Sequence, residues 1–222
     1  MFTFNGVGPI APQIIQNKEG YIDALTNIEY SWTGRIDLMF SHTFFLEAVQ
    51  LVRNAIVLFE QGYFDCSFYS LRQALEICTI IVYFADDTDE NRDIELSKWK
   101  QEHRFPMNQQ MIKELEKRET VFAEMKDKMS DYFLEVDLVK QKLNKYVHKQ
   151  GFDKFYISRA KSPKRDNLSK KLTGEFENYL TKTIGAIAVL RLAVDPFPVL
   201  LMDDDIYNRT EQLMTEKYTN DF

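Results

Sequence analysis

Residues that bend, break or cross-link a chain are scarce in this sequence. Only eight of the 222 residues are glycine, six are proline and two are cysteine. So few glycines and prolines argue against a loop-rich all-β fold. Cys66 and Cys78 fall in one apolar segment, and in a helix they would lie about 18 Å apart, so they cannot bond to each other. With no CxxC pair either, the cysteine content suits a reducing compartment.

Long apolar stretches are also lacking. The run IGAIAVL, at 184–190, is far too short to cross a bilayer. The opening residues, MFTFNGVGPIAPQ, have no basic segment followed by a long apolar one, so we expect no signal peptide. The sequence therefore predicts a cytoplasmic protein that does not bind membranes.

The common motifs of metal and phosphate chemistry are missing. Three widely spaced histidines and two cysteines do not form the cluster of ligands that a metal site needs. The acidic stretch 85–93 lacks the glycine and the terminal glutamate of a calcium loop, so we interpret it as a solvated loop. There is no glycine-rich phosphate loop and no GxSxG elbow. We therefore predict neither a metal nor a cofactor.

Helical periodicity, by contrast, is strong. Apolar residues recur at spacings of three and four between Ser41, a candidate N-cap, and Gly62, a candidate stop. The pattern resumes from Phe64 to Val82 after the short turn QGYFD, which predicts an antiparallel helical hairpin. In the first helix the apolar positions are Phe45, Val49, Val52, Ile56 and Phe59.

Three further regions have helical patterns. A weaker one follows Pro106, with apolar positions at Met111, Leu115 and Val121. A stronger helix begins near Ser130 and is expected to end at Gly151. A long last helix is closed by Pro196 and Pro198. The core positions expected in the last two helices are Tyr132, Val136, Val139, Leu143 and Tyr146, then Leu172, Phe176, Leu180, Ile184, Ile187, Leu190 and Val194.

These patterns predict an all-α protein, an up-and-down bundle of four main helices. Residues 1–40 are expected to form an irregular N-terminal arm with a short helix near 21–30. Residues 41–222 are expected to form a single helical domain, with a short C-terminal helix from Asp203.

Positive charge is concentrated in one segment. The chain carries a net charge of −6, but residues 140–171 hold eleven lysines or arginines and two acids, which gives this span +9 and the remainder −15. Aromatic residues alternate with the cations there, and flat and cationic side chains together suit phosphates and unstacked bases. The segment thus indicates an anionic partner, with RNA, in single-stranded form, as the expected ligand.

His148 lies in this segment. Asp137, Gln141, Asn144 and His148 recur at spacings of four, three and four, so they share one face of the helix. Asn144 is one turn from His148 and can fix its tautomer, whereas Lys142 lies about 120° around the helix. A plain structural interpretation is also open, because a histidine in the last turn of a helix interacts favourably with the helix dipole.

The spacing around His148 resembles the signature of the HEPN superfamily, helical bundles found in RNA-cleaving toxins and antiviral proteins. That motif is an arginine, often followed by a polar residue, then four to six residues and then a histidine. Here Lys142 stands at the arginine position, five residues before His148, and LRQALE at 71–76 is similar to a pattern in the paired opening helices of the family. The resemblance covers about 42–195. It implies metal-independent RNA cleavage and an expected homodimer.

The resemblance also implies roles for residues. His148 would move the proton, Lys142 would stabilise the phosphorane, and Asn144 would assist. Arg72 and Glu76, at i and i+4, are interpreted either as a structural pair or as support that supplies the missing guanidinium, and Gln141 as further support. The expected RNA contacts are Lys145, Lys149, Lys154, Arg159, Lys161, Lys164 and Arg165.

The lysine departs from the family motif and loses the two-pronged grip of arginine on phosphate. The sequence therefore leaves two functions open. One is an HEPN-like RNA-binding protein, with possible endoribonuclease activity, in bacterial stress or phage defence. The other is a catalytically silent helical module that dimerises or binds a partner protein or a nucleotide.

Overall fold

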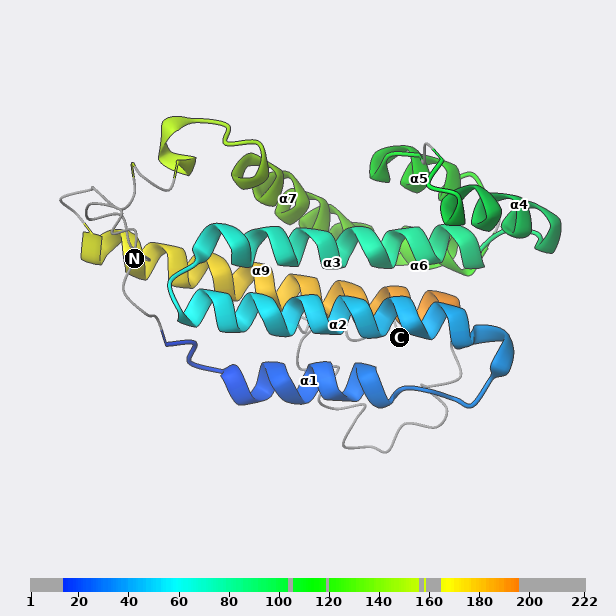
Figure 1. Ribbon diagram of the computed structural model, residues 1–222, viewed down its shortest axis with the longest axis horizontal. Coiled ribbons are helices and arrows are strands. Elements are labelled where there is room, and N and C mark those ends of the chain that lie inside the picture. Colours follow the sequence, from blue (N-terminus) through cyan, green and yellow to red (C-terminus); the bar gives the residue numbers. More distant parts are fainter. Residues whose placement is uncertain (1–13, 104–105, 119, 156–157, 159–164, 196–222) are drawn as a thin grey trace.

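A computed structural model describes residues 14–103, 106–118, 120–155, 158 and 165–195 (Figure 1). These residues contain helices and no strand, which confirms the all-α prediction. The elements are α1 Lys18–Tyr30, η1 Ile36–Leu38, α2 Met39–Glu60, α3 Phe64–Ala85, α4 Asp89–Lys100, α5 Asn108–Leu115, α6 Val121–Lys128, α7 Ser130–Val147, η2 Phe152–Lys154 and α9 Arg165–Val194.

The turn between α2 and α3 closes on Gly62. Its φ of 84° is in the left-handed region that favours glycine. The Gly62 N–H donates to the Phe59 carbonyl at 3.0 Å, and the Tyr63 N–H donates to the Leu58 carbonyl at 2.8 Å. This Schellman motif ends α2 at the predicted stop and lets α3 return along it as an antiparallel hairpin, as the short turn indicated (Figure 1).

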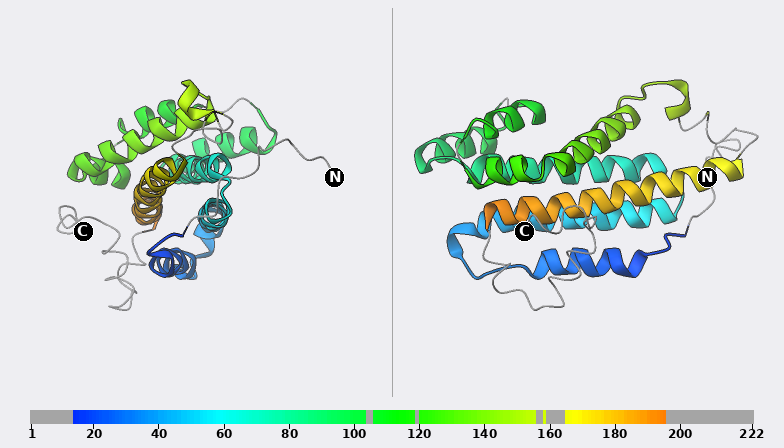
Figure 2. Two further views of the ribbon diagram at one scale, coloured as in Figure 1. Left: turned by 90° about the vertical axis from the view of Figure 1, so that its left-hand side faces the viewer. Right: turned by 180° about the vertical axis from the view of Figure 1, so that it is seen from behind.

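The long helices α2, α3, α7 and α9 share one core (Figure 2). The rings of Phe59 in α2 and Phe176 in α9 stack with their centroids 3.9 Å apart. Phe68 of α3 lies 4.3 Å from the ring of Tyr146 in α7. The apolar positions predicted for α7 are all buried, and those predicted for α9 are buried apart from the half-buried Val194.

Helix α1 belongs to the same core, although it falls in the segment expected to be an irregular arm. It is longer than the short helix predicted there and packs against α2 and α9. The Tyr21 hydroxyl lies 3.1 Å from the Thr181 hydroxyl of α9, and Arg53 of α2 forms an ion pair with Glu29 of α1 at 2.6 Å. The buried residues of α1 are Tyr21, Ala24, Leu25, Asn27 and Ile28.

Three local predictions were wrong. Ser41 is not an N-cap, because α2 begins at Met39 and Ser41 is buried inside it. The stretch 85–93 is not a single loop, because the Thr88 hydroxyl caps α4 by accepting from the Asn91 N–H. Val121 is 47% exposed, and the next residue, Phe122, is the one that packs into the core. The helix expected from Asp203 lies outside the described residues.

One described segment, Ile36–Glu60, is long and apolar enough to span a membrane by length and composition. Its residues Phe45, Val49, Val52, Ile56 and Phe59 are buried against the other helices. Core helices of soluble proteins have the same length and composition, so a single such helix is weak evidence for a membrane span.

Candidate functional site

His148 is the C-cap of α7, and its side chain is exposed. Its backbone N–H donates to the Asn144 carbonyl at 2.9 Å, and the next residue, Lys149, has a φ of 50°. The Gln150 N–H then donates to the Lys145 carbonyl at 2.9 Å, which completes a Schellman motif. The helix thus ends before Gly151, the predicted terminator, and holds the His148 backbone in hydrogen bonds while its ring remains accessible.

The His148 side chain lines one end of a groove of about 790 Å³ over α3. Helix α7 forms one wall of the groove, and α5 with the residues just before it forms the other. Figure 1 shows α5 and α7 over the same side of α3. From α7 the lining residues are Asp137, Lys140, Gln141, Asn144 and His148. These include the four residues whose spacing predicted a shared polar face.

Four cations line this groove with His148, namely Arg72 of α3, Lys113 of α5, Lys126 of α6 and Lys140 of α7. Arg72 Nε donates to Asn144 Oδ1, and its two terminal nitrogens lie 2.8 and 2.7 Å from the two carboxylate oxygens of Glu76. Arginine has five N–H donors, so three are engaged and two have no partner among the described residues. The expected support residues Arg72, Glu76 and Gln141 therefore lie together with His148 and Asn144.

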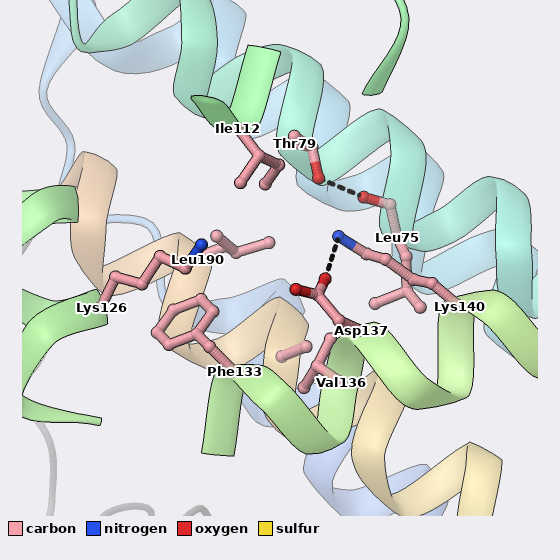
Figure 3. A pocket seen from close by; sticks show the side chains of 10 residues that line it. Leu75, Thr79, Ile112, Lys126, Phe133, Val136, Asp137, Lys140 and Leu190 are labelled. Carbon is pink, nitrogen blue, oxygen red and sulfur yellow. Dashed lines mark hydrogen bonds and ion pairs between the residues drawn. The ribbon is translucent and has the colours of Figure 1, made fainter. Parts of the chain in front are cut away.

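A small apolar cavity adjoins the groove beneath Lys140 (Figure 3). Lys140 Nζ lies 3.9 Å from Asp137 Oδ1, and Thr79 donates to the Leu75 carbonyl at 2.9 Å. Burial lowers the pKa of Lys140, and the Asp137 carboxylate opposes this effect. Burial raises the pKa of the nearby Cys78 thiol, so that thiol stays protonated and unreactive.

Lys142 does not line the groove. Its side chain is exposed, and Nζ lies 5.9 Å from the centre of the Tyr179 ring of α9. The two residues that the sequence motif paired, Lys142 and His148, are thus on different flanks of α7. The reason is geometric, because six residues along an α-helix turn the side chain by about 240°, which leaves the two 120° apart.

The predicted RNA contacts are in several environments. Lys145 is exposed. Lys149 forms an ion pair with Asp65 of α3 and lies 5.4 Å from the Tyr69 ring, while Lys154 forms an ion pair with Asp153 and lies 5.0 Å from the Tyr146 ring. Arg165 is the first residue of α9. Arg159, Lys161, Lys164 and the Arg165 side chain lie outside the described part of the structure.

Sequence reasoning missed several groove residues. Lys140 was counted only as part of the positive segment, yet it lies between α3 and α7. The residues from α5 and α6 were not considered, because nothing in their spacing relates them to His148. They become neighbours only through the packing of α5 on α3. The missed residues include Gln73, Met107, Asn108, Gln109, Ile112, Lys113, Glu116 and Lys126.

Within the described ranges, no group of three or more His, Cys, Asp or Glu side chains is placed to hold a metal ion. Comparison with known proteins gives no match to a family model, a curated protein or a solved structure.

Proposed function

We propose that this protein binds single-stranded RNA across the groove between α5 and α7 and cleaves it without a metal ion, with His148 as the proton-transfer group. The observation that carries the proposal is the placement of Arg72, Asn144 and His148 in one open groove. An exposed imidazole that lines the same groove as a guanidinium with free donors suits a reaction on a phosphodiester.

The chemistry assigns one task to each side chain. His148 accepts the proton of a ribose 2′-hydroxyl, whose oxygen attacks the adjacent phosphorus and expels the 5′-oxygen of the next nucleotide. The leaving 5′-oxygen takes a proton from water, and the protonated His148 returns its proton to the solvent. The products are a 2′,3′-cyclic phosphate and a 5′-hydroxyl end. Arg72 stabilises the charge on the phosphorane through its two unpartnered N–H groups. Asn144 lies one helical turn before His148 and accepts a hydrogen bond from Arg72, so it orients the guanidinium in the groove.

The arrangement supports the proposed HEPN-like character with one change of assignment. Arg72, and not Lys142, is the cation of the site, so the lysine in the motif does not exclude catalysis. Lys145 and the segment after it would extend the RNA contacts beyond the groove. A homodimer and a role in bacterial stress or phage defence stay predictions from the resemblance alone, and a cytoplasmic location stays a prediction from the sequence composition.

The test is cleavage of a fluorescent single-stranded RNA by the purified full chain in excess EDTA. We expect cyclic-phosphate products that persist in the chelator and disappear with His148→Ala. Gln150→Ala, an exposed polar change just beyond the helix end, serves as the matched control and should keep activity. Cleavage that EDTA abolishes, or that His148→Ala retains, would contradict the proposal.

A second function is favoured by the ion pairs of the groove. Both terminal nitrogens of Arg72 are paired with Glu76, and Lys140 and Lys126 are paired with Asp137 and Glu116. Cations engaged in this way suit a silent module that binds RNA, a nucleotide or a protein without cutting. Binding of the same RNA by both the unmodified protein and His148→Ala, with cleavage by neither, would support this alternative.

A further inference from the structure

The groove is lined by one more cation than it has acids. Four of its lining residues are lysine or arginine and three are aspartate or glutamate, and each acid is paired with one of the cations. The pairs are Arg72 with Glu76, Lys126 with Glu116 and Lys140 with Asp137. Lys113 of α5 is the fourth cation and has no ion pair among the described residues. With His148 neutral, the groove therefore carries one surplus positive charge, although the whole chain has a net charge of −6.

The acids close to Lys113 along the helix have other partners. Lys113 is exposed, and the acids within one turn of it are Glu114 and Glu116. Glu114 accepts a hydrogen bond from the Tyr83 hydroxyl at 2.9 Å, and Glu116 forms its ion pair with Lys126 of α6. The ammonium group of Lys113 is thus available to a ligand in the groove.

Two further groups in the groove have hydrogen-bond donors to spare. Arg72 keeps two N–H donors without a partner among the described residues. The Nδ2 atom of Asn108, another lining residue from α5, is buried and has no hydrogen-bond partner in the described part of the chain. A buried donor of this kind is costly unless a ligand accepts from it. Donors on Arg72, Asn108 and Lys113 together favour an anionic ligand rich in acceptors, as the phosphate oxygens of a nucleic-acid strand are.

Arg72 and Lys113 belong to different sides of the groove. The Arg72 guanidinium donates to Asn144 of α7, the wall that also carries His148, whereas Lys113 is part of the α5 wall (Figure 1). The groove volume of about 790 Å³ is typical of sites for molecules much larger than one phosphate group. A strand that lies between the walls can therefore present different phosphates to the two cations.

We propose that Lys113 binds a phosphate of the RNA strand other than the one that reacts at Arg72 and His148. The inference rests on the proposed function for its ligand class. It adds a contact that holds the strand without taking part in the chemistry. It also implies a substrate that extends past the reacting phosphodiester, so a dinucleotide, which has only that one phosphate, should bind poorly.

The first test is binding of a fluorescent 2′-O-methyl RNA strand, which lacks the attacking hydroxyl and stays intact, to the full chain at several salt concentrations. Lys113→Ala should reduce the slope of log affinity against log salt by about 0.7, the value for one phosphate contact of a single strand. Lys113→Arg should keep the slope. Lys117→Ala is the matched control, because Lys117 is also exposed but does not line the groove, and it should keep the slope too.

The second test separates binding from chemistry. In single-turnover cleavage, Lys113→Ala should raise the protein concentration that gives the half-maximal rate and leave the rate at saturation within about twofold. The same substitution should not change cleavage of a dinucleotide, which cannot reach both cations. A loss at saturation as large as that of Arg72→Ala would place Lys113 on the reacting phosphate and overturn the inference.

The outcomes distinguish this inference from the proposed nuclease. A salt slope that Lys113→Ala leaves unchanged, together with cleavage that depends on His148, would remove the Lys113 contact and leave the nuclease. A slope that falls with Lys113→Ala, with no cleavage by the unmodified protein, would remove the nuclease and leave the contact. Binding of poly(Glu) that depends on Lys113, with no binding of the RNA strand, would assign the groove to an acidic protein segment and overturn the inference.

Discussion

At the scale of single residues, two cations are candidates for stabilising the phosphorane in the proposed reaction at His148. Lys142 has the sequence spacing of the motif, but its ammonium group lies near Tyr179 on the flank of α9. Arg72 comes from another helix and lines the groove with His148. The residue that a linear motif singles out is therefore not the residue that the fold brings to the site.

Substitution at these two positions gives opposite expectations for cleavage. Arg72→Ala should lower the single-turnover rate about 100-fold, the effect typical of removing one donor to a developing oxyanion. Lys142→Ala should change it by no more than about twofold, because only a distant, screened charge is lost. Arg53→Ala, which breaks a similar arginine–glutamate pair between α1 and α2, controls for general destabilisation. A large loss with Lys142→Ala and none with Arg72→Ala would restore the assignment made from the motif.

At the scale of elements, the two helix ends at Gly62 and Lys149 use the same motif with different residues. Both positions have positive φ, 84° for Gly62 and 50° for Lys149. Glycine adopts this region freely, so the end of α2 was predictable. A lysine in this region costs free energy, which its ion pair with Asp65 offsets. Because a lysine is not expected at positive φ, the sequence pointed to Gly151 as the end of α7.

This difference predicts that, at Lys149, a glycine variant is more stable than an alanine variant, the reverse of their usual order inside a helix. Lys149→Gly should be more stable to urea than Lys149→Ala by about 1 kcal/mol, because only alanine pays a steric penalty at positive φ. At Lys145, inside the last turn of α7, the same pair should rank the other way, with alanine more stable by about 1 kcal/mol. The same ranking at both positions would show that Lys149 is not left-handed in solution.

At the scale of the whole molecule, the end of α9 is joined to the connection between α1 and α2. Asp195 is fully buried; it accepts a hydrogen bond from the Thr33 hydroxyl at 2.8 Å and lies 3.5 Å from the Arg191 guanidinium. Arg191 is also buried and donates to the Ser31 carbonyl at 3.0 Å. These polar contacts join segments some 160 residues apart in the sequence.

Removing this carboxylate should destabilise the whole fold. Asp195→Ala leaves the buried Arg191 without its counter-charge and should lower the free energy of unfolding by roughly 3 kcal/mol, measured by urea denaturation. Asp37→Ala is the control, since it removes an exposed carboxylate paired with Arg35 and should cost no more than about 0.5 kcal/mol. Equal effects of the two substitutions would mean that Asp195 does not anchor the end of α9.

The sequence by itself determined the helices and the faces they bury. Apolar spacing in α2, α3, α7 and α9 is a local property, fixed by 3.6 residues per turn, so the core positions and the hairpin at Gly62 could be predicted. The shared polar face of Asp137, Gln141, Asn144 and His148 followed from the same periodicity. At the end of α7, where Lys149 has a distant partner in Asp65 of α3, the predicted stop at Gly151 was wrong.

Only the tertiary structure decided which residues share a groove with His148. Arg72 reaches Asn144 because α3 and α7 pack together, and Asn108 reaches the same groove because α5 packs on α3. Such contacts join residues tens of positions apart, and helix packing, not spacing along one helix, sets their distances. The sequence thus specified each wall of the groove separately, and the packing of the helices made them one site.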